Sequence, residues 1–129
     1  MRAIDTNVIV RFLTGDDPAQ TARARKLVEA GGIFVPTSVL LETEWVLRSG
    51  YGFAAERLVR ALRDFASLPG VTLEDPRLAA MALDRAEQGI DFADALHLAA
   101  ARGCTAFMSF DRGLAKAAAG VVEMRVAAP

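Results

Sequence analysis

The sequence predicts an α/β domain in which a mostly parallel central sheet is flanked by helices on both faces. Short apolar segments alternate with longer amphipathic segments along the whole chain, a pattern typical of strands that alternate with helices. The 129 residues fit one domain, and a hydrophobic fraction of 53% allows a core that needs no disulfides. We therefore expect a single domain over residues 1–129.

The N-terminal part of the chain opens with a short apolar strand that ends at Asp5. In the second helix Asp17 fits the N-cap position and Pro18 fits the first turn, where its missing N–H costs nothing. Either Thr37 or Ser38 is expected to cap the helix after the second strand. The expected elements are a strand at 3–4, helices at 7–13 and 18–30, a strand at 33–35, a helix broken at 49–52, and a helix at 54–67.

The C-terminal part repeats the alternation. Pro69 and Gly70 form a turn into the next strand, and glycines stop the two helices that follow. The expected elements are a strand at 71–73, helices at 75–88 and 91–103, a strand at 105–109, a loop with Asp111, alanine-rich turns at 114–119 and a strand at 121–125.

The composition narrows the classes of function. The lone Cys104 allows no internal disulfide, and no secretory signal or apolar run of about 20 residues is visible, so we expect a soluble cytoplasmic protein. The 15 basic and 16 acidic residues give a net charge of −1. This charge counts against a nucleic-acid substrate, unless a bound metal supplies the positive charge.

Acidic residues recur where the predicted strands end. Asp5 follows the first strand, Glu42 lies early in the helix after the second, and Asp111 follows the fourth. Asp94 lies one turn into its helix. Ligand sites in open α/β sheets form beyond the carboxyl ends of the strands, and converging carboxylates need a cation between them. With one His and one Cys in the chain, oxygen ligands favour Mg²⁺ or Mn²⁺ over zinc, and such an ion can activate water to hydrolyse a phosphodiester.

Each acid also has a structural explanation. Asp5 can cap the first helix, and Asp91 fits the N-cap of the helix that contains Asp94. Asp94 can complete a capping-box-like exchange with Asp91, or serve as a first-turn acid favoured by the helix dipole. Glu42 and Glu44 flank the apolar face of their helix on opposite sides, so periodicity does not choose between them.

Four segments resemble PIN-domain proteins, and more narrowly the VapC toxins of bacterial and archaeal toxin–antitoxin pairs: IDTNVIVRFLTGDDP, SVLLETEWVLRSGYG, DFADALHLAAA and SFDRGL. The resemblance covers essentially the whole chain, with the segments in the family's order and spacing. It implies that the catalytic acids and metal ligands are Asp5, Glu42, Asp94 and Asp111. It further implies supporting roles for Thr6, Asn7, Asp91 and Ser109.

The resemblance implies an Mg²⁺- or Mn²⁺-dependent endoribonuclease that hydrolyses RNA, such as tRNA or another structured RNA. It also implies a VapB-like antitoxin as partner and a homodimer. The alternative is a PIN-like protein-binding module with weak or no nuclease activity. A phosphatase of the haloacid dehalogenase type fits poorly, because Asp5-Thr6-Asn7 lacks the second acid of that family's motif. His97 is expected to be structural, and Arg11, Arg48 and Arg112 to be solvated.

Overall fold

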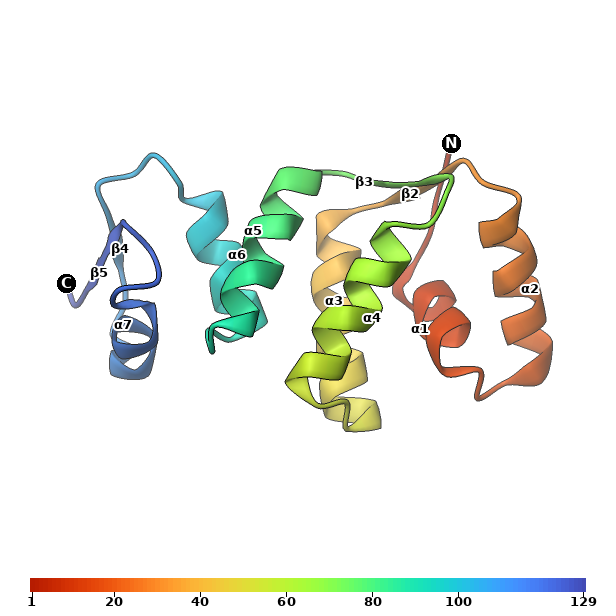
Figure 1. Cartoon of the computed structure of the whole chain (residues 1–129), viewed down its shortest axis with the longest axis horizontal. Helices are drawn as coiled ribbons and strands as arrows, with labels where there is room; N and C mark the ends of the chain where they lie inside the picture. The colour runs from red at the N-terminus through yellow and green to blue at the C-terminus, as the bar shows by residue number, and fades with distance from the viewer. The chain divides into compact units, whose positions relative to one another are not determined.

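The computed structural model describes all 129 residues, which form two compact units: unit 1, Met1–Pro76, and unit 2, Arg77–Pro129 (Figure 1). Strands pair only in parallel, and helices connect them. The prediction of an α/β fold with parallel strands is confirmed. The strands form one sheet of three and one of two. None of the helices is both long enough and apolar enough to span a bilayer.

Unit 1 is built on the three-stranded sheet, in the order β1-β2-β3. Arg2 pairs with Ile33 in the register of β1 and β2, and Ile33 pairs in turn with Val71 of β3. Helix α1 packs against α2 and α3, and α4 packs against α3 and β3. The elements are β1 (Arg2–Ala3), α1 (Thr6–Thr14), α2 (Pro18–Glu29), β2 (Ile33–Val35), α3 (Thr37–Tyr51), α4 (Ala55–Ala66) and β3 (Val71–Leu73).

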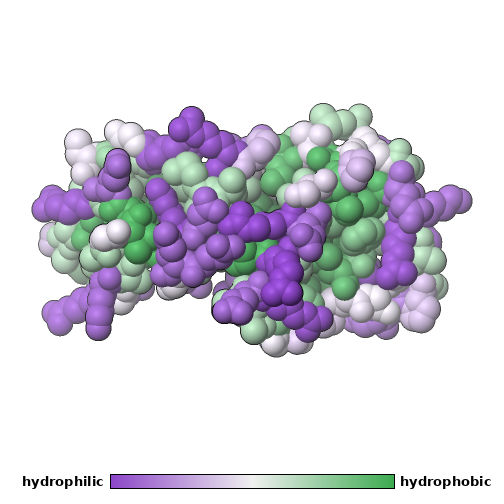
Figure 2. Space-filling view, viewed as in Figure 1, coloured by the Kyte–Doolittle hydropathy of each residue, from purple (hydrophilic) through white to green (hydrophobic).

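The core of unit 1 follows from the predicted amphipathic pattern. Its fully buried side chains include Ile9 of α1, Ile33 and Val35 of β2, Leu47 of α3 and Leu62 of α4. Helix α4 shows the pattern most clearly: its apolar side is buried, and Figure 2 shows hydrophilic residues over its outer side. Removal of this apolar surface from water is the main source of stability for such a unit.

The N-cap residue predicted from the sequence is confirmed for α2 and wrong for α3. Asp17 caps α2 by accepting a hydrogen bond from the Gln20 N–H at 3.0 Å, with Pro18 in the first turn. Neither Thr37 nor Ser38 caps α3, because Pro36 occupies the N-cap and the Thr37 N–H donates to Glu74 Oε1 at 2.8 Å. A residue that follows β3 therefore replaces the local cap.

The break predicted at residues 49–52 is also wrong. Helix α3 continues through Ser49 and Gly50 to Tyr51, and it ends at Gly52, whose positive φ of 69° suits glycine. The Phe53 N–H then bonds to the Leu47 carbonyl at 3.0 Å, which closes the helix end. The extra turn brings Tyr51 into unit 1's candidate site.

Unit 2 contains nearly all of α5 and the two-stranded sheet. Its elements are α5 (Pro76–Glu87), α6 (Phe92–Ala100), β4 (Ala106–Met108), α7 (Arg112–Ala118) and β5 (Arg125–Ala127). Residues 112–118 form a helix instead of the expected turns. The last strand lies at 125–127 and not at 121–125, because the Val121 and Val122 N–H groups bond to the Ala118 carbonyl. Helix α6 ends at Ala100, short of the expected residue 103.

Candidate functional site

Two of the predicted acids line one pocket in unit 1. This acidic pocket has a volume of about 360 Å³. Asp5 and Glu42 lie at it together with the supporting residues Thr6 and Asn7. Its complete lining is Asp5, Thr6, Asn7, Val10, Arg11, Glu42, Val46 and Tyr51. The structure thus brings all four predicted residues of unit 1 together.

Asp5 reaches the pocket because it is the N-cap of α1. Its backbone is extended, and its Oδ1 accepts a hydrogen bond from the Thr6 N–H at 2.7 Å. The capping explanation for Asp5 is therefore right. It does not exclude a functional role, because the side chain stays exposed at the pocket.

The structure separates Glu42 from Glu44, which periodicity could not. Glu42 is exposed, and its Oε1 accepts a hydrogen bond from the hydroxyl of the buried Thr6. Glu44 is 4% exposed and pairs with Arg48, with 3.1 Å between Nε and Oε2. Glu42 therefore faces the acidic pocket, whereas Glu44 forms an ion pair with Arg48 of its own helix.

Arg11 borders the acidic pocket but is held by neighbours. Its Nη1 lies 3.2 Å from Asp16 Oδ1 and 3.3 Å from the Tyr51 hydroxyl, and its Nε donates to Gln20 Oε1 at 2.7 Å. Tyr51 in turn donates to Asp16 Oδ2 at 2.5 Å, and this hydrogen bond is the main reason that the pKa of Asp16 lies below its ordinary value. Sequence reasoning missed Tyr51, because it placed this residue in a break.

The other predicted acids lie in unit 2, where Asp91, Asp94 and Asp111 form an acidic group. Asp91 caps α6, and its Oδ2 accepts from the Asp94 N–H at 3.2 Å. Burial raises the pKa of Asp94, and the charges of Asp91 and Asp111 raise it further. Asp94 is therefore close enough to Asp91 and to Asp111 for its charge to be repelled by each. The exposed His97 opposes this effect and lowers the pKa of Asp94.

Asp111 is held by hydrogen bonds on both sides. It is the N-cap of α7, and its Oδ1 accepts from the Leu114 N–H at 3.0 Å. Its own N–H donates to the Ser109 hydroxyl at 3.0 Å, which gives the predicted supporting residue Ser109 a positioning contact. The sequence pattern placed Asp111 in a loop and did not suggest that it is a cap.

The donors suit a hard divalent ion. Carboxylate, hydroxyl and amide oxygens are the ligands that Mg²⁺ and Mn²⁺ prefer, and the repulsion around Asp94 is relieved by a cation. Within neither unit do three or more His, Cys, Asp or Glu side chains lie close enough to hold an ion by themselves. The residues present fit such an ion by their chemistry.

The sequence matches the PIN domain family over residues 3–120. A search of curated proteins found no match. PIN domains generally have a metal-dependent nuclease fold, and they typically use divalent metal ions. Since the match covers most of its length, this chain belongs to the PIN domain family.

Proposed function

We propose that this protein is an Mg²⁺- or Mn²⁺-dependent endoribonuclease whose catalytic acids and metal ligands are Asp5, Glu42, Asp94 and Asp111. The observation that carries the proposal is the position of these carboxylates. Asp5 and Glu42 share the acidic pocket of unit 1, and Asp94 and Asp111 share the acidic group of unit 2. Membership of a family of metal-dependent nucleases supports the same chemistry.

The neighbouring residues would position these acids. The Thr6 hydroxyl orients Glu42, and the Ser109 hydroxyl receives the N–H of Asp111. The bound ion would lower the pKa of a water molecule and polarise a phosphate oxygen. Asp94, whose carboxylate is destabilised by burial and by its neighbours, gains most from a nearby cation. We assign a supporting role to Asn7 at the acidic pocket and to Asp91 at the acidic group.

For the biological role we propose a VapC-type toxin that acts on RNA in the cytoplasm and is neutralised by a VapB-like antitoxin. The four sequence segments that resemble VapC toxins support this role. A homodimer is the assembly that the resemblance favours, and tRNA or another structured RNA is the expected substrate. Cleavage in a cell that lacks the antitoxin should arrest growth.

The test compares Asp5→Asn and Asp94→Asn with the wild type in cleavage of fluorogenic RNA with Mn²⁺. We expect the cleavage rate of each variant to fall at least about a hundredfold. Loss of a metal ligand should lower the rate more than loss of a side chain that only hydrogen-bonds to a ligand. Glu123→Gln is the control, since it removes one exposed carboxylate of unit 2 outside the acidic group. Full cleavage by a folded Asp94→Asn protein would exclude the assignment. A wild type that cleaves no RNA would favour the protein-binding alternative.

A further inference from the structure

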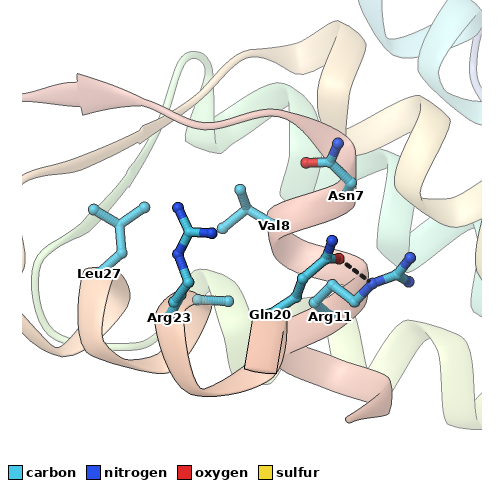
Figure 3. A pocket seen from close by; sticks show the side chains of 7 residues that line it. Asn7, Val8, Arg11, Gln20, Arg23 and Leu27 are labelled. Atoms are coloured by element: carbon cyan, nitrogen blue, oxygen red, sulfur yellow. Dashed lines mark hydrogen bonds between the residues drawn. The ribbon is translucent and has the colours of Figure 1, made fainter. Parts of the chain in front are cut away.

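A second pocket lies beside the acidic pocket in unit 1. This groove, which we call the α1–α2 groove, has a volume of about 390 Å³ and runs between α1 and α2 (Figure 3). Its lining is Asn7, Val8, Arg11, Gln20, Arg23, Ala24 and Leu27. We propose that it binds the backbone of single-stranded RNA next to the point of cleavage, with Arg23 as the main phosphate contact. This inference rests on the proposed nuclease function.

The charge of the groove favours an anionic ligand. No Asp or Glu lines it, and it contains the guanidinium groups of Arg11 and Arg23. Arg11 is already engaged with Asp16 and Gln20. Arg23 is exposed and makes no ion pair or hydrogen bond, so its donors are available for a phosphate.

The position of the groove favours RNA over other anions. Asn7 and Arg11 line both this groove and the acidic pocket, so the two pockets are neighbours on α1. A strand with its cleaved phosphate at the carboxylates of Asp5 and Glu42 would place a neighbouring phosphate in the groove. A nucleic-acid chain carries a phosphate at every nucleotide. The acids would hold the metal at the cleaved phosphate, and the arginine would hold the adjacent phosphate of the same backbone.

The remaining lining suits a nucleotide. Figure 3 shows the Arg23 side chain extending from α2 toward Val8 of α1, with Leu27 on its other side. Val8 and Leu27 offer an apolar surface to a ribose or base. Gln20 accepts the Arg11 hydrogen bond through Oε1, which leaves its NH₂ group as a donor. The groove therefore combines a cation, amide donors and an apolar wall.

The test measures binding of a fluorescein-labelled single-stranded RNA by anisotropy at several salt concentrations, with EDTA to prevent metal-dependent cleavage. Arg23→Ala should weaken binding roughly tenfold. It should also lower the salt slope by about 0.7, the value for one phosphate of a single strand. Arg23→Lys should keep most of the slope because it retains the charge.

Arg25→Ala is the matched control. It removes the same charge from an exposed position of the same helix, but Arg25 lines a different pocket, with Phe12, Glu29 and Leu68. Equal affinities and equal salt slopes for Arg23→Ala and Arg25→Ala would overturn the proposal. Binding that depends on Arg23 in a protein that cleaves nothing with Mn²⁺ would support the groove and refute the nuclease, so the two failures are distinguishable.

Discussion

Asp5, Asp91 and Asp111 each accept a backbone N–H at the start of a helix, so these side chains serve the fold whatever else they do. Substitution by alanine removes the cap and the charge together, whereas asparagine keeps a capping oxygen and removes only the charge. Loss of activity in an alanine variant of these residues therefore does not separate misfolding from lost chemistry.

We expect the two substitutions of Asp111 to separate these effects. Asp111→Ala should lower the free energy of unfolding by about 1 kcal/mol, because the Leu114 N–H loses its acceptor. Asp111→Asn should cost little stability. Both variants should lose RNA cleavage. Urea unfolding measures the change in stability, and a fluorogenic RNA assay measures the cleavage. An active, stable Asp111→Asn protein would reduce Asp111 to a helix cap.

Asp94 should make stability depend on pH. Its pKa is raised by burial and by Asp91 and Asp111, so its ionised form destabilises the folded state. The stability that the protonated carboxyl contributes is complete below its ordinary pKa of about 3.9. It is lost as the pH rises through the higher pKa of Asp94 in the folded protein.

Asp94→Asn should therefore stabilise the metal-free protein at neutral pH. We expect a gain below about 1 kcal/mol, because Asp94 is partly exposed and solvent screens its charge. The gain should vanish in acid, where the wild-type carboxyl is neutral. Thermal unfolding in EDTA across the pH range measures it, with Glu123→Gln as the control. A destabilised Asp94→Asn protein at neutral pH would contradict the repulsion.

At the scale of elements, the turns place the strands and helices. The turn before β3 brings Gly70 against Gly31, and the Gly70 carbonyl accepts the Ile33 N–H of β2 at 2.8 Å. A Cβ at Gly70 would lie 2.7 Å from the Gly31 Cα, and Gly70 has a positive φ of 81°. Both observations require glycine at this position, since backbone atoms on each side cannot give way.

Gly70→Ala should accordingly cost more stability than Gly52→Ala. Gly52 also has a positive φ, but nothing lies within 4 Å of its Cβ position, so it bears only the backbone cost of about 1–2 kcal/mol. Gly70→Ala adds the steric clash, and we expect a total of about 3 kcal/mol or more. Urea denaturation of the two variants compares them. Equal losses would show that the turn can open without cost.

At the scale of the whole molecule, the proposed metal ligands come from both units. Asp5 and Glu42 belong to unit 1, and Asp94 and Asp111 belong to unit 2. A ligand that binds only the folded protein raises its stability, by about 2.7 kcal/mol at a hundredfold excess over its Kd. An ion bound by the acids of either unit should therefore stabilise that unit.

We expect Mn²⁺ to raise the Tm of the wild type, and Asp5→Asn and Asp94→Asn each to reduce this increase. Glu44→Gln should keep it, because Glu44 pairs with Arg48 and lies outside the acidic pocket. Thermal unfolding with and without Mn²⁺ measures the effect, and EDTA should reverse it. An unchanged Mn²⁺ response in Asp5→Asn would remove Asp5 from the set of ligands.

Local sequence patterns are enough to predict the alternation of helices and strands and the caps Asp17 and Asp91. Periodicity and capping depend on neighbours within one or two turns, so local reading suffices for them. Other features depend on contacts between residues that are distant in sequence. The start of α3 depends on Glu74, and the different surroundings of Glu42 and Glu44, which periodicity did not distinguish, depend on Thr6 and Arg48.

Contacts between distant residues also explain the position of the last strand and the raised pKa of Asp94. The position of β5 is set by its pairing with β4, and the local pattern around Val121 does not contain that partner. The raised pKa of Asp94 arises from burial, from the nearby Asp91 and from Asp111, and the last of these lies at the start of another helix. Interactions through space between residues distant in sequence leave no periodic signal, so only the folded chain reveals them.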